Sequence, residues 1–245
     1  MHTLFISDLH LHESRPHITR AFFHFLRTQA VGAEALYILG DFFDTWIGDD
    51  DDSVLAQDVA SELKTLHTQG IAINFIHGNR DFLLGKDYAD KAGMTLLPES
   101  IVIDLYGTPT LILHGDELCT EDTEYQQFRT MVRSKPWQQQ VLAQPLSERR
   151  ALATQLREKS QSMNSMKAEE IMDVTPAEVI ARMEAAGVTR MIHGHTHRPA
   201  RHSIMINNQF AERVVLGDWH EFGWCIKADK NSINLQHWEI EQNTP

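Results

Sequence analysis

The feature that most constrains the fold is a series of five short polar motifs, each beginning where an apolar run ends. The motifs are Asp8-Leu9-His10, Gly40-Asp41-Phe42-Phe43-Asp44, Gly78-Asn79-Arg80-Asp81, His114-Gly115-Asp116 and Gly194-His195-Thr196-His197. The apolar runs before them are typical of buried strands. Because sites in open α/β sheets form at the carboxyl ends of the strands, we expect the five motifs to meet at one edge of a sheet.

Short β-like runs alternate along the chain with stretches whose apolar residues recur at helical spacing. The runs before the motifs are Thr3–Ser7, Ala35–Leu39, Ile71–His77, Thr110–His114 and Arg190–His193, and the helical stretches are Ile18–Gln29, Ser53–Gln69 and Pro176–Ala186. Further strands are predicted at Ile101–Leu105, Arg213–Leu216, Gly223–Ala228 and Ile233–Glu239. This alternation predicts an α/β fold, and the strand-rich C-terminal quarter predicts a second sheet packed on the first.

One segment breaks this alternation. From Asp122 to Met172 the sequence has no strand signal and is rich in Gln, Arg and Ser. Because the segment lies between two of the polar motifs, we interpret residues 122–172 as a helical insertion that covers the site. The core then consists of residues 1–121 and 173–245.

The side chains of the motifs are of the types that bind divalent first-row metals. Imidazole and carboxylate groups without a thiolate favour Mn, Fe or Zn over Ca. Asp41 offers two oxygens, which is enough to bridge two cations. Each motif on its own is commoner as a turn or loop, but five in this order favour a site for two metal ions. The candidate ligands are Asp8, His10, Asp41, Asn79, His114, His195 and His197.

Composition narrows the class of protein further. The formal net charge is −12, which disfavours a sequence-independent nucleic-acid binder, because such binding needs a basic surface. The two cysteines have no CxxC spacing, which fits a reducing cytoplasm. We read no signal peptide at the N-terminus and no stretch apolar enough to span a membrane. The acidic run Asp49–Asp52 is interpreted as a solvated loop and helix start.

The ordered motifs resemble those of the calcineurin-like metallophosphoesterase superfamily, which are D-x-H, G-D, G-N-[HR], a later His and G-H-x-H. Longer strings resemble the branch of that superfamily that cleaves UDP-2,3-diacylglucosamine in lipid A biosynthesis. Those strings are IHGNRDFLLG, LPE, LHGDELCTED, IMDV, IHGHTHRPA and RVVLGDWH. The resemblance extends from Leu4 to about Trp219. It implies a four-layer α/β/β/α sandwich of two mixed sheets with a helical lid.

The resemblance also implies the roles of individual residues. One metal would be held by Asp8, His10, Asp41 and His197, and the second by Asp41, Asn79, His114 and His195. The expected cofactor is two Mn²⁺ ions per chain, with Fe or Zn compatible with these ligand types. The implied substrate contacts are Asn79, Arg80, Asp122, Ser160, Asn164, Lys167 and His195. The implied catalytic residues are Asp41, Asn79, Arg80, His114 and His195.

Arg80 gives a specific expectation about the substrate. Many relatives have histidine at this position, which can protonate a poor leaving group, whereas arginine stays charged and cannot act as that acid. Arginine can hold a phosphate group bidentately and stabilise developing charge. The sequence therefore favours cleavage of a diphosphate. By resemblance, hydroxide activated by the metals attacks the α-phosphorus and yields UMP and 2,3-diacylglucosamine 1-phosphate.

The insertion predicts contact with an amphiphilic partner. Its apolar residues are candidates for an acyl-chain groove or for packing onto the core, and they are Phe128, Met131, Val132, Trp137, Val141, Leu142, Leu146, Leu152 and Leu156. Its basic residues favour an anionic membrane surface, although solvated helix faces have a similar composition. We therefore expect a cytoplasmic monomer, peripherally associated with the inner membrane, whose substrate is an amphiphilic nucleotide sugar.

Three other interpretations remain open at this point. The first is a nucleotide phosphodiesterase or another phosphoesterase on the same scaffold. The second is a scaffold subunit that has kept the fold but lost its metals, and the third is a lipid-binding module whose metals are structural. A complete set of ligands disfavours the second, and loss of activity in an Asp8→Ala variant would exclude the third.

Overall fold

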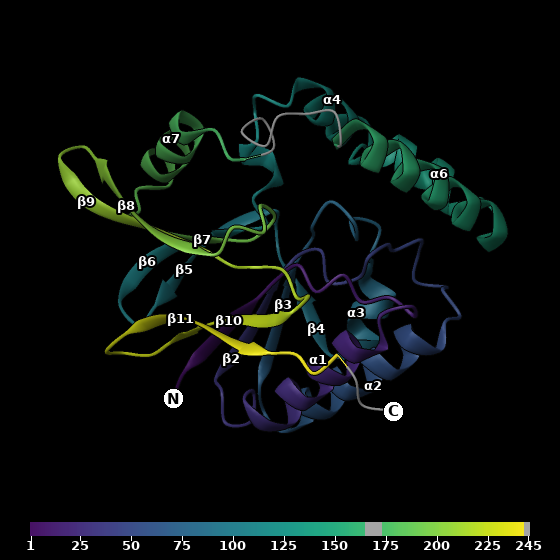
Figure 1. Ribbon diagram of the computed structural model, residues 1–245, viewed down its shortest axis with the longest axis horizontal. Coiled ribbons are helices and arrows are strands. Elements are labelled where there is room, and N and C mark those ends of the chain that lie inside the picture. The colour runs from purple at the N-terminus through teal and green to yellow at the C-terminus, as the bar shows by residue number, and fades with distance from the viewer. Residues whose placement is uncertain (165–172, 243–245) are drawn as a thin grey trace.

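Two mixed sheets carry the five motifs in the computed structural model, which describes residues 1–164 and 173–242 (Figure 1). The first sheet has the strand order β11-β10-β1-β2-β3-β4, and the second has the order β5-β6-β7-β9-β8. The first consists of β1 (Thr3–Ile6), β2 (Ala35–Leu39), β3 (Ala72–Ile76), β4 (Met94–Leu96), β10 (Phe222–Ala228) and β11 (Ile233–Glu239). The second consists of β5 (Ser100–Leu105), β6 (Thr108–Leu113), β7 (Arg190–His193), β8 (Ala200–Ile206) and β9 (Gln209–Val215).

Helices cover the outer face of each sheet (Figure 1). The first sheet packs on α1 (Pro16–Thr28), α2 (Val54–Thr68) and α3 (Lys86–Ala92), and the second packs on α7 (Pro176–Ala186). Alternate residues of a strand face opposite layers, so Leu4 and Ile6 of β1 point to the helices while Phe5 points to the second sheet. Three apolar cores thus join four layers, which confirms the predicted α/β/β/α class.

The remaining helices lie between β6 and α7 in the chain, and the last of them is at the far end of the molecule from the β8–β9 hairpin (Figure 1). They are η1 (Asp116–Leu118), α4 (Thr123–Val132), α5 (Lys135–Leu142) and α6 (Leu146–Asn164). Proline marks the starts of two of them, because it lacks an amide hydrogen and fits the first turn of a helix. Pro136 lies in the first turn of α5, and Pro145 directly precedes α6. In the described residues, no helix is both long and apolar enough to cross a membrane.

The sequence patterns missed three elements. The helix α3 and the strand β4 are short, and neither has a clear period. The strand β8 is an edge strand in which residues 200–203 are mostly polar, so no apolar run marks its start. It pairs with β9 around Asn207 and Asn208, both of which have positive φ as a tight hairpin turn requires.

The topology brings the five motifs to one edge. Strands β1, β2 and β3 are parallel neighbours, so the motifs that follow them share the carboxyl edge of the first sheet. Strands β6 and β7 are also parallel neighbours and place the other two motifs at the corresponding edge of the second sheet. The candidate ligands therefore come from two sheets that face each other.

Candidate metal centre

Backbone hydrogen bonds join the motif loops to one another. The amide of Asp8 donates to the carbonyl of Gly40 at 3.1 Å, and the amide of His10 donates to the carbonyl of Asp41 at 3.0 Å. In the second sheet the amide of Gly194 donates to the carbonyl of His114 at 2.8 Å. These bonds extend the strand pairing beyond the sheets, so the loops have fixed positions relative to each other.

Five of the seven candidate ligands have left-handed backbone conformations. Their φ angles are 56° at Asp8, 48° at His10, 49° at Asp41, 70° at His195 and 55° at His197. This region costs a non-glycine residue about 1–2 kcal/mol, and it persists only where the surrounding structure enforces it. Such outliers cluster at functional sites, and here they coincide with the residues that the motifs singled out.

Glycines in the motifs allow the loops to approach closely. A Cβ atom on Gly78 would lie 2.2 Å from the backbone nitrogen and a carboxylate oxygen of Asp41. A Cβ atom on Gly194 would lie 2.2 Å from the hydroxyl of Ser7 and 2.3 Å from a carboxylate oxygen of Asp8. Only glycine fits at these two positions without moving a candidate ligand.

The first group of converging donors is Asp8, His10 and His197, whose ligand atoms lie within 4.8 Å of one another. The Nε2 atoms of His10 and His197 are 3.2 Å apart, and Nε2 of His197 is 3.5 Å from Oδ1 of Asp8. An oxygen of Asp41 lies 4.0 Å from Nδ1 of His10. The four residues that the resemblance assigns to one metal are therefore together.

The second group is Asp8, Asp41 and His114, whose donor atoms also lie within 4.8 Å of one another. Nε2 of His114 is 3.6 Å from Oδ1 of Asp41 and 3.0 Å from Oδ1 of Asn79. The ring of His195 lies in contact with that of His114, with centroids 5.0 Å apart, and its backbone amide donates to Asp8 at 2.9 Å. The assignment of His195 and Asn79 as ligands stays a prediction.

The hydrogen bonds of these side chains leave ligand atoms free for a cation. Nδ1 of His114 donates to the carbonyl of Leu39 at 2.8 Å, so its Nε2 keeps the lone pair, as in most metal-bound histidines. Among the described residues, Oδ1 of Asp8 and Nδ1 of His10 are buried without a hydrogen-bond partner. Buried polar atoms are normally paired. This donor set fits divalent cations of the manganese, iron or zinc type.

Burial and neighbouring charges shift the pKa values of the donors in both directions. Burial raises the pKa of Asp41 to about 7 and lowers the pKa of His10 to about 3, whereas the Asp8 carboxylate raises the pKa of His197 to about 9 despite burial. A neutral imidazole has the lone pair that a metal needs, and a buried carboxylate needs a positive partner. A bound cation would supply the positive charge that the carboxylates of Asp8 and Asp41 need.

Further hydrogen bonds hold the loop after β3 against the loop after β2. The carboxylate of Asp81 accepts from the amides of Phe42 and Gly78 at 2.7 and 2.8 Å. Oδ1 of Asp41 accepts from the amide of Arg80 at 2.8 Å. The positions of Asn79 and Arg80 are thus tied to that of Asp41.

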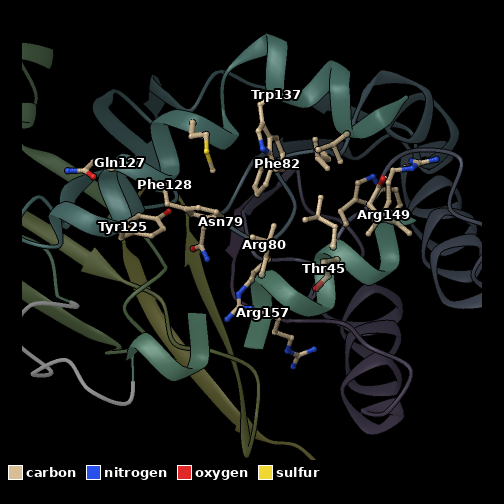
Figure 2. Close-up of a pocket in the computed structure, with 18 of the residues that line it drawn as sticks. Thr45, Asn79, Arg80, Phe82, Tyr125, Gln127, Phe128, Trp137, Arg149 and Arg157 are labelled. Carbon is tan, nitrogen blue, oxygen red and sulfur yellow. Dashed lines mark hydrogen bonds between the residues drawn. The ribbon is translucent and has the colours of Figure 1, made fainter. Parts of the chain in front are cut away.

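A cavity of about 740 Å³ opens beside the cluster (Figure 2). Asn79 and Arg80 line it from the loop after β3, and in Figure 2 Asn79 lies between Tyr125 and Arg80. Most of the wall is apolar. Of the nine apolar residues predicted to line a groove, six line this cavity: Phe128, Met131, Trp137, Val141, Leu152 and Leu156.

The other predicted substrate contacts have different positions. Asp122 is the N-cap of α4, and its side chain accepts from the amide of Tyr125 at 3.1 Å. Ser160 and Asn164 lie in α6, for which the structure describes only the backbone at these positions. Lys167 lies outside the described residues. These four assignments stay predictions.

Ion pairs between α6 and the loop after β2 were not anticipated from the sequence. Arg149, whose side chain is only 3% exposed, donates to Asp50 and to the carbonyl of Ile47. Arg157 pairs with Asp44, and Arg150 pairs with Asp51 and Asp52. The acidic run is the partly exposed loop before α2, as predicted, but that interpretation missed that its carboxylates also dock α6 over the cavity.

Asp49 of the same run contacts the start of α3 and the indole of Trp46. Its carboxylate accepts from the amides of Gly85 and Tyr88 at 2.8 and 3.1 Å, at the start of α3. It also accepts from the indole of Trp46, which lines the cavity, at 3.2 Å. Long-range pairing of this kind leaves no local sequence signal, apart from an acidic run that faces a basic segment elsewhere in the chain.

Comparison with known proteins assigns the family. A family model described as calcineurin-like phosphoesterase matches residues 1–199. The chain is 63% identical to the UDP-2,3-diacylglucosamine hydrolase of Cellvibrio japonicus, over 98% of this chain and 100% of that protein. It is 54% identical to the hydrolase of the same name from Marinobacter nauticus, over 97% and 98% of the two chains. A solved archaeal phosphodiesterase matches 98% of this chain and 99% of its own, at 14% identity and a TM-score of 0.46.

The family model covers well over half of the chain, and these two relatives match nearly all of it. The chain is thus a hydrolase that belongs to the calcineurin-like phosphoesterase family and, within it, to the UDP-2,3-diacylglucosamine hydrolase family.

Proposed function

We propose that this chain hydrolyses the diphosphate bond of UDP-2,3-diacylglucosamine, giving UMP and 2,3-diacylglucosamine 1-phosphate in lipid A biosynthesis. The observation that carries the proposal is the junction of two different environments. A cluster of metal-ligand side chains lies beside a mainly apolar cavity, and Asn79 and Arg80 connect the two. An amphiphilic substrate with a diphosphate needs both environments. The names of the relatives support the same substrate.

The donor set suits two Mn²⁺ ions. Asp8, His10, Asp41 and His197 would hold one ion, and Asp41, Asn79, His114 and His195 would hold the other. When bound, a pair of divalent cations supplies Lewis-acid stabilisation of the phosphoryl oxygens and lowers the pKa of water. The chain itself supplies the fixed geometry, through the strained backbones of the ligands and the hydrogen bonds behind them.

Arg80 acts on the diphosphate. Its Nε atom is buried and has no hydrogen-bond partner among the described residues, although the side chain lines the cavity. A guanidinium with free donors beside a phosphate site binds phosphoryl oxygens and stabilises charge on the leaving phosphate. Such a leaving group needs little help from a proton donor, since the second pKa of a phosphate monoester is about 6.

The cavity takes the acyl chains. Its wall consists mainly of aromatic and aliphatic side chains from α4, α5 and α6, and pockets of this size and character hold lipid-like ligands. The lipid phosphate then leaves on the side of the cavity, and attack at the α-phosphorus releases UMP on the opposite side.

We further propose that the protein works as a cytoplasmic monomer at the inner membrane, without nucleic-acid partners. Its substrate is a membrane lipid, and two apolar residues of the helices are exposed: Met131, which lines the cavity, and Leu142 on α5. The arginines of α6 support the membrane surface less than the sequence suggested, because Arg149, Arg150 and Arg157 pair with carboxylates of the core.

The position of attack is testable by isotope labelling. UDP-2,3-diacylglucosamine is hydrolysed in H₂¹⁸O with Mn²⁺, and the products are separated by mass spectrometry. We expect the label in UMP, because attack at the α-phosphorus places the solvent oxygen there. Label in the lipid phosphate would contradict the proposed orientation. Faster turnover of a simple phosphodiester than of the diphosphate would favour a nucleotide phosphodiesterase instead.

The role of Asp41 as the shared ligand is testable with Asp41→Asn. The asparagine keeps an oxygen for the amide of Arg80 but loses the charge that two cations would share. We expect hydrolysis to fall by about a thousandfold or more, as for loss of a principal electrostatic group. Thermal unfolding is measured in chelator and in excess Mn²⁺, which separates an effect on metal binding from an effect on folding.

In chelator the variant should melt no lower than the wild type, because burial already disfavours the charge of Asp41. Mn²⁺ at a hundred times its dissociation constant should stabilise the wild type by about 2.7 kcal/mol and the variant by much less. Asp58→Asn, at an exposed position of α2, is the matched control. Equal stabilisation of wild type and Asp41→Asn by Mn²⁺ would exclude the bridging role.

The acyl-chain cavity is testable by filling it. Ala153 of α6 lines the cavity, and Ala151 on the same helix is exposed. We expect Ala153→Trp to raise the KM for the long-chain substrate about tenfold or more, because the indole occupies volume that the chains need. Turnover of an analogue with two-carbon acyl groups should change little. If Ala151→Trp had the same effect, or Ala153→Trp had none, the chains would lie elsewhere.

A further inference from the structure

Arg133 contacts three separate segments with one guanidinium group. It is the C-cap residue of α4, and its side chain is only 12% exposed. Nη2 donates to the carbonyl of Gly78 at 2.9 Å and lies 3.7 Å from a carboxylate oxygen of Asp116. Nη1 lies 3.2 Å from a carboxylate oxygen of Glu99. The side chain therefore joins α4 to the loop after β3, the turn after β6 and the start of β5.

The carbonyl of Gly78 is linked directly to the candidate ligand Asn79. It belongs to the peptide group whose nitrogen is that of Asn79, and the amide oxygen of Asn79 lies 3.0 Å from Nε2 of His114. On its other side, the amide of Gly78 is held by Asp81 at 2.8 Å. The residue has no room to shift toward Asp41, since even a Cβ atom would collide there. A rotation of this peptide would therefore move the Asn79 side chain relative to the metal cluster.

The same guanidinium also contacts the wall of the cavity. Its central carbon lies 5.5 Å from the ring centre of Phe82, close enough for a cation–π interaction. Phe82 lines the cavity and packs on Trp137 of α5, with ring centres 6.0 Å apart (Figure 2). Arg133 thus lies between the cluster and the lipid-facing wall.

The neighbouring Arg129 provides a contrast. It is also partly buried on α4, but among the described residues it pairs with the carboxylates of Asp116, Glu99 and Glu117. Arg129 therefore links α4 to acidic side chains. Of this pair, Arg133 alone donates to the backbone of the loop that carries Asn79 and Arg80. A buried, charge-assisted bond of this kind restricts peptide orientation more than a neutral one.

We propose that Arg133 is a positioning residue for the hydrolysis, which holds the Gly78–Asn79 peptide so that Asn79 and Arg80 face the metal cluster and the diphosphate. The inference rests on the proposed function and extends it, since it makes α4 part of the metal centre and not only a cover for the cavity. Misplacement of reacting groups by about 1 Å can cost about a hundredfold in rate.

The test compares Arg133→Met, which keeps the apolar stem, with Arg133→Lys, which keeps the charge. For each variant, kcat and KM for UDP-2,3-diacylglucosamine are measured, together with the dissociation constant for Mn²⁺ by electron paramagnetic resonance of the free ion. For Arg133→Met we expect kcat to fall about tenfold or more and Mn²⁺ binding to weaken about tenfold, as for other supporting groups of metal ligands. KM should change less than kcat, and Arg133→Lys should recover part of both losses.

Arg27→Met is the matched control, because Arg27 lies on α1, is exposed and pairs with Glu62 of α2, away from the cluster and the cavity. It should retain kcat and Mn²⁺ affinity within about twofold, as for most exposed ion pairs. Arg133→Met with kcat and Mn²⁺ affinity equal to those of the control would overturn the inference, even if its melting temperature were lower. If Arg133→Met does not fold, the test rests on Arg133→Lys. Wild-type kcat and Mn²⁺ affinity in Arg133→Lys would then overturn the inference.

The wild-type protein separates this inference from the proposed function. If the wild type neither binds Mn²⁺ nor hydrolyses the substrate, the proposed function fails, and the inference fails with it. If the wild type does both while the Arg133 variants equal it, only the role of Arg133 fails.

Discussion

The structure depends on the convergence of buried carboxylate and imidazole side chains at one point. The carboxylates of Asp8 and Asp41 and the imidazoles of His10 and His114 meet where the ends of the two sheets face each other. Buried carboxylates are costly without a compensating positive charge, as the raised pKa of Asp41 indicates. The left-handed backbones of the ligands add to this cost. A bound cation would offset both, which explains why so much of the fold serves to hold these side chains in place.

The rest of the molecule positions the candidate ligands and builds the cavity beside them. Parallel strands bring the motifs to a shared edge, and glycines let the loops approach within contact distance. The helices after β6 then build an apolar cavity next to the cluster, and ion pairs to the loop after β2 hold α6 over it. Metal chemistry and lipid recognition are therefore joined by a few shared residues, of which Asn79 and Arg80 are the clearest.

The sequence predicts the cluster well because its signals are local. Each ligand follows a strand whose apolar run is readable, and the five motifs occur together in one order along the chain. It predicts less of the surroundings, because pairing partners such as Arg149 and Asp50 are about a hundred positions apart and leave no periodic pattern. The same applies to Arg133, whose bond to the carbonyl of Gly78 depends on tertiary structure alone. The edge strand β8 was missed because residues 200–203 are mostly polar and no apolar run marks its start.

The most direct test of the central claim is anomalous X-ray diffraction at the manganese absorption edge, from crystals grown with Mn²⁺. We expect two peaks in the cluster, with the carboxylate of Asp41 bound to both, His10 and His197 at one and His114 at the other. A single peak, or peaks away from Asp8 and Asp41, would contradict the claim.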